Sequence, residues 1–203
     1  ATLNEALAFA ANEPSGLTFV DAAEQDHFIS WAEVQRRAQK FAGGLRGLGV
    51  APGDRVAIVL PTSPEFCDAF FGALLAGAVP VPLYPPVRLG RMDEYHASTA
   101  RMLNVCGAAL VVSDRRIRLL LGQALANARA PLGLHTAGEL AKSSAGGPRE
   151  AQPDELALIQ FSSGSTVEPK PVALDHRALL AQVAALESLM PLSHHENPRG
   201  LSW

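Results

Sequence analysis

The residues best suited to chemistry lie in one short segment between positions 160 and 175, where hydroxyl side chains, a glycine and a lysine follow an apolar run. Each hydroxyl can donate a hydrogen bond, the glycine lets the backbone approach an anion without a Cβ in the way, and the lysine supplies a mobile positive charge. This combination predicts a loop that binds a polyphosphate. The candidate ligands are Ser162, Ser163, Gly164, Ser165, Thr166 and Lys170.

Two familiar catalytic loops do not fit this segment. The common nucleotide P-loop has a lysine and a hydroxyl residue directly after its second glycine, whereas Lys170 lies between Pro169 and Pro171. Ser163 lies in Phe-Ser-Ser-Gly-Ser and not in the Gly-x-Ser-x-Gly turn of hydrolases, so no catalytic serine is predicted. On these residues alone, a plain Ser/Gly-rich turn between two ordered elements stays an equal alternative.

Ordered elements are expected on both sides of the loop. The run 156–161 is short and apolar enough for a buried strand that brings the loop to the carboxyl edge of a sheet, where ligands of open α/β sheets bind. After the loop we expect a short strand over 172–174 and a helix over 176–190 that Asp175 caps and Pro191 ends. The loop is therefore predicted to be held at both ends.

The first part of the chain predicts a helix, a hairpin and a core helix. The helix covers residues 2–11, and strands over 17–20 and 27–30 are expected to pair. Ser30 and Glu33 fit a capping box at the start of a helix whose apolar residues recur at helical spacing up to Leu48. This apolar stripe predicts a helix that packs on the core.

The central part alternates strands and helices. Expected strands cover 55–60, 79–84 and 108–113, and expected helices run from Pro64 to the cap Gly77, over 92–105 and over 115–128. Strand, helix and strand in this order make parallel crossover units. The prediction is an α/β fold, a doubly wound, mostly parallel sheet with flanking helices. Residues 142–155, rich in Ser, Gly, Pro and charge, are expected to form a surface loop before the strand that carries the phosphate loop.

Residues 161–172 also resemble a known signature, that of the adenylate-forming (acyl-activating) superfamily, which reads roughly aromatic-Thr-Ser-Gly-Ser/Thr-Thr-Gly-x-Pro-Lys-Gly-Val. The superfamily includes acyl-CoA synthetases, peptide-synthetase adenylation domains, luciferases and fatty acyl-AMP ligases. Residues 28–34 and 74–82 are similar to two of its structural motifs. The resemblance implies that residues 1–203 are the N-terminal part of an AMP-binding (adenylation) domain, the first part of the large N-terminal domain of these enzymes.

In that superfamily the loop holds the β and γ phosphates of ATP and then pyrophosphate, with Mg²⁺ accompanying ATP. The resemblance implies this role for the six candidate residues, position by position, and it assigns no catalytic residue within the chain. Val167 and Pro171 stand where the signature has glycine. A β-branched residue makes a left-handed backbone costly at the first position, and proline lacks an N–H that could bond a phosphate at the second.

Residues 82–95 are most similar to the fatty acyl-AMP ligases. Those ATP-dependent acid-activating ligases convert a fatty acid and ATP to acyl-AMP and pyrophosphate, and pass the acyl group to an acyl carrier protein. The resemblance implies the N-terminal fragment of such an enzyme, without the superfamily's ribose-binding aspartate and catalytic lysine, and we expect the isolated chain to be inactive. Alternatives are part of an acyl-CoA synthetase or peptide-synthetase adenylation domain, or a non-catalytic docking or structural module.

The composition of the chain limits the classes of partner molecule and the cellular location that we expect for this protein. The net charge is −3 with dispersed basic residues, which argues against nucleic acid as a partner. No secretory leader and no apolar stretch of about 18 residues is visible, so we expect a cytoplasmic protein without a membrane span. Cys67 and Cys106 are expected to be free thiols in apolar surroundings. The adjacent His194, His195 and Glu196 lack the spacing of a metal site, and no protein-bound metal is predicted.

Overall fold

A four-stranded parallel sheet forms the centre of the computed structural model, which describes residues 1–21, 23–86, 89–144, 146–162, 169–190 and 200. The strand order is β4-β3-β5-β6. The strands are β3 (Arg55–Val59), β4 (Val79–Pro82), β5 (Ala108–Ser113) and β6 (Leu134–Thr136). They are connected by α3 (Pro64–Ala76), by the short 3-10 helix η1 (Leu89–Arg91) with α4 (Met92–Cys106), and by α5 (Arg115–Ala126). The predicted doubly wound α/β fold is confirmed.

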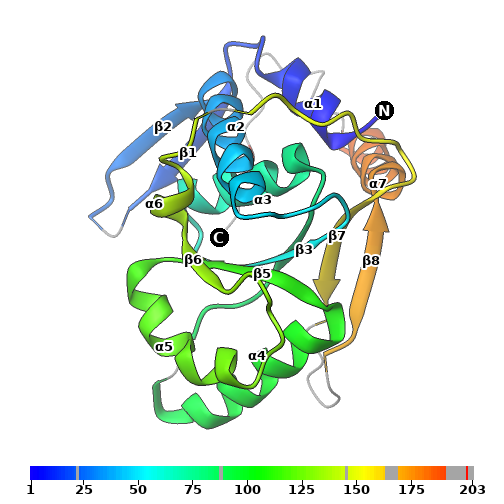
Figure 1. Cartoon of the computed structure of the whole chain (residues 1–203). Coiled ribbons are helices and arrows are strands. Elements are labelled where there is room, and N and C mark those ends of the chain that lie inside the picture. Colours follow the sequence, from blue (N-terminus) through cyan, green and yellow to red (C-terminus); the bar gives the residue numbers. More distant parts are fainter. Residues whose placement is uncertain (22, 87–88, 145, 163–168, 191–199, 201–203) are drawn as a thin grey trace.

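The alternation of side chains along β3 builds two separate cores. Val56 and Ile58 pack in the cluster that contains Phe41 of α2 (Trp31–Gly47). Ala57 and Val59 pack in a second cluster, with Leu103 of α4. Successive residues of a strand point to opposite faces, so α2 and α3 cover one face of the sheet while α4 and α5 cover the other (Figure 1).

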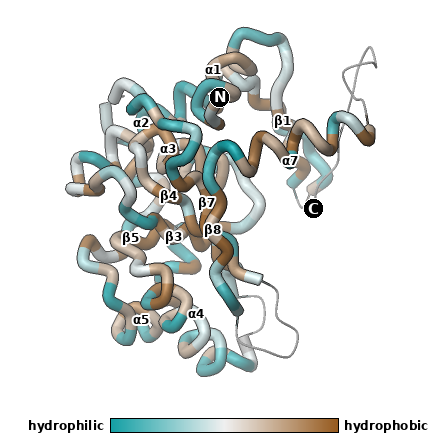
Figure 2. The backbone as a smooth tube through the Cα atoms, turned by 90° about the vertical axis from the view of Figure 1, so that its right-hand side faces the viewer, coloured by the Kyte–Doolittle hydropathy of each residue, from teal (hydrophilic) through white to brown (hydrophobic). Residues whose placement is uncertain are grey.

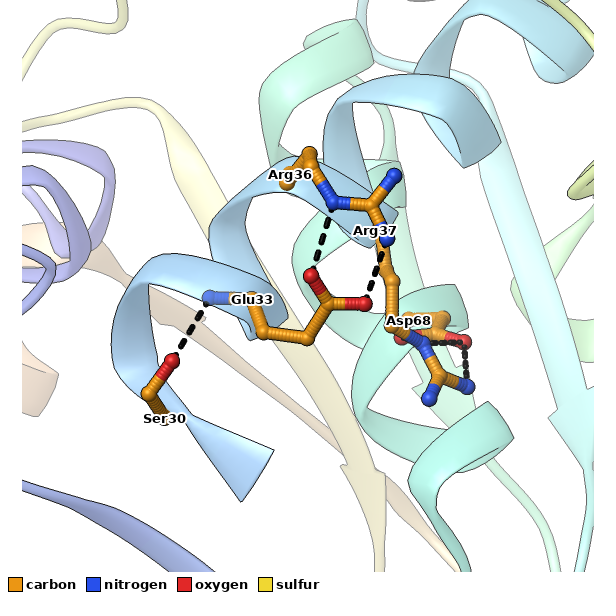
Figure 3. Close-up of polar contacts among 5 residues, drawn as sticks. All are labelled: Ser30, Glu33, Arg36, Arg37 and Asp68. Carbon is orange, nitrogen blue, oxygen red and sulfur yellow. Dashed lines mark hydrogen bonds and ion pairs between the residues drawn. The ribbon is translucent and has the colours of Figure 1, made fainter.

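The N-terminal region matches the predicted helix and hairpin. It contains α1 (Leu3–Ala10), β1 (Gly16–Val20) and β2 (Asp26–Ser30), and the two strands pair antiparallel. The hydroxyl of Ser30 accepts a hydrogen bond from the backbone N–H of Glu33 at 3.2 Å, which caps α2 (Figure 3). The expected reciprocal half of the capping box is absent from this cap, because the Glu33 carboxylate instead accepts hydrogen bonds from Arg36.

The boundaries of α3 are set by two residues with clear roles. Ser63 caps its start by accepting a hydrogen bond from the Phe66 N–H at 3.4 Å. Gly77 ends it in the left-handed conformation with φ +83°, as the sequence predicted. Glycine adopts this conformation without the Cβ penalty that other residues incur.

Two elements were not expected from the sequence. They are β6, which pairs parallel with β5, and α6 (Ala137–Leu140) directly after it. The described part of 142–155 contains neither helix nor strand, and crosses back over α3. There the Arg149 N–H donates to the Leu75 carbonyl at 2.9 Å, and the Arg149 guanidinium pairs with Glu155.

The strand before the candidate loop differs from its prediction. β7 (Leu156–Phe161) pairs antiparallel with β8 (Pro171–Asp175) and is not bonded into the parallel sheet. Only Ala157 and Ile159 of β7 are buried. The expectation of a fully buried strand is therefore wrong, because the chain returns as a neighbouring strand and leaves one face of the hairpin open.

The last described helix, α7 (His176–Leu189), begins with the predicted cap, in which Asp175 accepts from the Ala178 N–H at 2.6 Å. Its C-terminal half projects from the molecule with apolar residues in view (Figure 2). Val183 is 57% exposed and Leu189 is 78% exposed. The predicted stop at Pro191 lies outside the described residues. Within the described part of the chain, no helix has the length and apolarity needed to cross a bilayer.

Candidate functional site

The two ends of the candidate loop are hydrogen bonded to each other. The Ser162 N–H donates to the Lys170 carbonyl at 3.0 Å, and the Lys170 N–H donates to the Ser162 hydroxyl oxygen at 3.1 Å. The last pair of the hairpin below them joins Phe161 to Pro171, the first residue of β8, a position where proline is tolerated in strands. Both Ser162 and Lys170 are exposed. A hydroxyl that accepts one bond can still donate another.

The structure therefore brings together two of the six predicted site residues. Ser163, Gly164, Ser165 and Thr166 lie outside the described residues, as does the atypical Val167. Their role in phosphate binding stays a prediction.

The loop starts at the carboxyl edge of the parallel sheet, as predicted. An apolar pocket with a volume of about 620 Å³ is lined by residues at the ends of three strands. Leu60 and Pro61 follow β3, Leu83 follows β4, and Gln160 and Phe161 end β7. Because Ser162 follows Phe161 directly, the mouth of the hairpin adjoins this pocket.

The other walls of the apolar pocket come from β1, α3 and α4 through Phe19, Phe66, Cys67 and Met102. None of its described lining residues carries a full charge at neutral pH. Burial raises the pKa of the Cys67 thiol to about 11, so this thiol is neutral at pH 7 and a poor nucleophile. The pocket offers a large apolar volume and no reactive ionised group.

A second cavity of about 300 Å³ lies between α4 and the returning end of the loop. Its lining includes the charged residues Glu94 and Arg101 and also Pro169. Met102 and Phe161 belong to the walls of both cavities. A cavity with two charged residues in its lining and an uncharged apolar pocket therefore adjoin beside Phe161, the residue that precedes Ser162.

A third cavity, of about 410 Å³, lies where β3, β5 and β6 end. The helix N-termini at this point are already capped by the side chains of Ser63, Asp114 and Thr136. Its lining also carries both signs of charge, including Glu65 and Lys142. Satisfied N–H groups and mixed charges make this cavity a poor anion site.

Other polar residues serve the fold. His176 is buried, and its Nδ1 accepts a hydrogen bond from the Leu3 N–H at 3.1 Å. Cys106 is buried and Cys67 is half-buried, and both are free. No cluster of three or more His, Cys, Asp or Glu residues able to hold a metal exists in the described ranges. His194, His195 and Glu196 lie outside them.

The sequence reading missed most residues of the apolar pocket. Leu60, Cys67, Leu83 and Met102 come from segments far apart in the chain and show no shared motif. One signal was available, because residues directly after each parallel strand lie at the carboxyl edge. Applied to β3 and β4, that rule points to Leu60 and Leu83.

Comparisons with known proteins agree with this geometry. The family model of the AMP-binding enzyme matches residues 7–201. A long-chain-fatty-acid–AMP ligase of Mycolicibacterium smegmatis is 31% identical over 86% of this chain and 28% of its own length. A 4-coumarate–CoA ligase of Solanum tuberosum is 32% identical over 81% of this chain and 31% of its own length.

A solved structure from a study of fatty acyl-adenylate ligases from E. coli and L. pneumophila superposes with a TM-score of 0.84. It is 29% identical and is matched over 92% of this chain and 34% of its own length. The chain belongs to the AMP-binding enzyme family. It spans about a third of the length of these relatives.

Proposed function

We propose that this chain is the N-terminal, phosphate-binding part of an ATP-dependent acid-activating ligase of the fatty acyl-AMP ligase type. The observation that carries this proposal is the hairpin mouth, where Ser162 and Lys170 are bonded to each other beside an apolar pocket at the carboxyl edge of the sheet. The similarity to a long-chain-fatty-acid–AMP ligase over most of the chain supports a fatty acid as the substrate.

In the proposed reaction, a carboxylate oxygen attacks the α-phosphorus of ATP. A new P–O bond forms, the bond to the bridging oxygen of the β-phosphate breaks, and its electron pair leaves with pyrophosphate. Negative charge therefore grows on the β and γ phosphates. Donors that already point at those phosphates stabilise this charge without reorganising.

The loop supplies such donors. Ser162, Ser163, Ser165 and Thr166 offer hydroxyls, Gly164 lets the backbone come close, and Lys170 adds a positive charge. The paired loop ends fix the spacing between Ser162 and Lys170 before the nucleotide arrives. By similarity to the superfamily, Mg²⁺ is proposed to enter with ATP, as part of the substrate.

ATP–pyrophosphate exchange dependent on fatty acid tests this proposal. We expect exchange in a longer protein that carries this segment, loss of exchange by at least about a hundredfold in Lys170→Ala, and no exchange in the isolated 203 residues. The exposed Lys142, which lies outside the loop, provides the matched control Lys142→Ala. Full exchange in the Lys170→Ala variant would exclude the proposed role of the loop.

The acyl acceptor is proposed to be the thiol of an acyl carrier protein, by similarity to the fatty acyl-AMP ligases. A 4-coumarate–CoA ligase of comparable identity keeps coenzyme A as the alternative. Acyl-AMP made by the longer protein can be offered both acceptors in competition. Acyl transfer to coenzyme A alone would place the chain in an acyl-CoA synthetase.

The exposed apolar side of α7 supports an alternative function for this chain, that of a non-catalytic docking module. Val183, Leu186 and Met190 expose 57%, 44% and 59% of their surface. Apolar surface of this kind normally marks a contact with other protein. A stable complex between this chain and another polypeptide, formed without any nucleotide affinity, would favour this module over a ligase.

A further inference from the structure

The third cavity, of about 410 Å³, lies where the parallel sheet reverses its winding direction. From β3 the chain passes through α3 to β4 at one edge, and from β5 it passes through α5 to β6 at the other. The helices α3 and α5 cover opposite faces of the sheet (Figure 1). Because β3 and β5 are neighbours, their carboxyl ends flank a crevice between these two helices. Ligands of open α/β sheets bind in such a crevice, at the topological switch point.

The cavity carries charges of opposite sign on its two helix walls. Glu65 lies in the first turn of α3, and Arg115 is the first residue of α5. Lys142, just after α6, adds a second positive charge. Within the described part of the chain, none of these three side chains forms a hydrogen bond or an ion pair. The two other acids of the lining, Asp114 and Glu139, already accept backbone hydrogen bonds in helix caps.

Free charges of both signs in one crevice indicate the class of ligand. We propose that this cavity binds a small zwitterion with its ammonium and carboxylate groups at opposite ends, such as an ω-amino acid or a short peptide. The carboxylate pairs with Arg115 and Lys142, and the ammonium pairs with Glu65. An ion of a single charge gains only one of these interactions and meets a like charge at the other wall. The inference goes beyond the proposed function, because it requires neither ATP nor the phosphate loop.

The rest of the lining suits the spacer between the two charged ends. It is uncharged and includes Leu60, Pro61, Ala137 and Gly138. A Cβ added at Gly138 would meet no other part of the chain within 4 Å, so this residue borders open space. The volume of about 410 Å³ lies within the range of small-molecule sites, roughly 300–1,000 Å³. Since the charged lining side chains are exposed, we expect weak binding that decreases as salt is added.

The zwitterion ε-aminocaproate is a suitable probe. It would be titrated at neutral pH and low salt into the isotope-labelled 203-residue chain, with the amide NMR signals of residues 136–138 as the readout. Caproate and hexylammonium match the probe in length and carry one charge each. We expect saturable shifts with ε-aminocaproate and at least about fivefold weaker binding of either control. Equal binding of the probe and of either control at these signals would overturn the proposal.

A matched pair of variants on α5 tests the positive wall. Arg115→Gln removes a lining charge and should weaken ε-aminocaproate binding at least about fivefold. Arg116→Gln makes the same change at the next residue, which is exposed and does not line the cavity, and should bind as the wild type does. Glu65→Gln should weaken the probe but not caproate, because only the ammonium loses its partner. An equal loss in Arg115→Gln and Arg116→Gln would trace binding to overall charge and overturn the proposal.

Two further variants test the location of the ligand. Gly138→Leu fills the open space without changing a charge and should abolish the saturable shifts, while the remaining amide spectrum reports that the chain is folded. Lys170→Ala, in the phosphate loop, should leave ε-aminocaproate binding unchanged, so this inference and the proposed function succeed or fail separately. Undiminished binding in a folded Gly138→Leu variant, or loss of binding in Lys170→Ala, would place the ligand elsewhere and overturn the proposal.

Discussion

Arg37 of α2 and Asp68 of α3 form a buried ion pair in which the guanidinium donates hydrogen bonds of 3.0, 3.0 and 2.6 Å to one carboxylate (Figure 3). The two side chains differ in burial, with 28% of Arg37 but only 6% of Asp68 exposed. Burial raises the pKa of the Asp68 carboxyl even though the hydrogen bonds from Arg37 lower it. The pair holds together the two helices that cover one face of the sheet.

Removing Arg37 should therefore destabilise the fold more than removing Asp68. Arg37→Ala leaves a buried carboxylate without a partner, which costs about 3–5 kcal/mol of unfolding free energy at pH 7. Asp68→Ala leaves an arginine that can still reach water, and should cost less. Urea denaturation of both variants measures the difference, and equal losses would contradict the assigned asymmetry.

The Arg37→Ala variant should also recover stability as the pH falls toward 5. The folded-state pKa of Asp68 is raised by burial and rises further without Arg37, so the folded state binds more protons than the unfolded state. Stability then decreases as the pH rises through that pKa. The double variant Arg37→Met with Asp68→Leu removes both charges and should show no such slope in this window.

His176 should make the stability of the wild-type chain fall in weak acid. Burial lowers the pKa of His176 below its usual 6.5, so the unfolded state binds more protons as the pH falls through about 6.5, and stability decreases there. His176→Asn keeps an acceptor for the Leu3 N–H but cannot titrate, and should flatten the slope between about pH 5 and 7. Denaturation curves over that range test this, and an unchanged slope in the His176→Asn variant would contradict it.

Gly77→Ala should destabilise the junction of α3 and β4. The residue has φ +83°, and an added Cβ would lie 2.5 Å from the Arg149 side chain. A left-handed conformation costs other residues about 1–2 kcal/mol. Gly122→Ala, in the interior of α5 with open space around it, should instead stabilise by about 0.5–1 kcal/mol. Thermal unfolding of both variants checks the contrast.

Ser162→Ala should weaken nucleotide binding. The substitution removes the acceptor for the Lys170 N–H and one proposed phosphate donor, a loss of about 1–1.5 kcal/mol or five- to tenfold in affinity. ATP titration of the longer protein measures it. Ser188→Ala on α7, whose hydroxyl bonds only its own helix among the described contacts, should bind ATP as the wild type does. Equal affinity in all three proteins would remove Ser162 from the site.

Local signals in the sequence were sufficient for most of the fold. The cap at Ser30, the glycine at 77 and the apolar strands of the sheet follow from residue types and spacing. β6 could not be found this way, because its three residues become a strand only by pairing with β5. The antiparallel pairing of β7 was also hidden, since a short apolar run does not reveal the direction of its partner.

The candidate site was predictable only in part. The hydroxyls, Gly164 and Lys170 stand together in the sequence, so a phosphate-binding role could be predicted from the sequence alone, and it stays a prediction. The bonds between Ser162 and Lys170 depend on the hairpin, and the apolar pocket depends on the order β4-β3-β5. Those arrangements come from packing between distant segments, which residue spacing does not encode.

The hydrogen bonds between the two ends of the loop also determine which changes of loop length and sequence we expect the hairpin to tolerate. Because Ser162 and Lys170 are bonded to each other, the strands on either side are already held together whatever lies between them. Lengthening a loop with fixed ends costs little, about 0.6 kcal/mol for each doubling. We therefore expect insertions and replacements between these two residues to leave the hairpin of β7 and β8 folded, so that variants of the proposed phosphate loop can be compared in one scaffold.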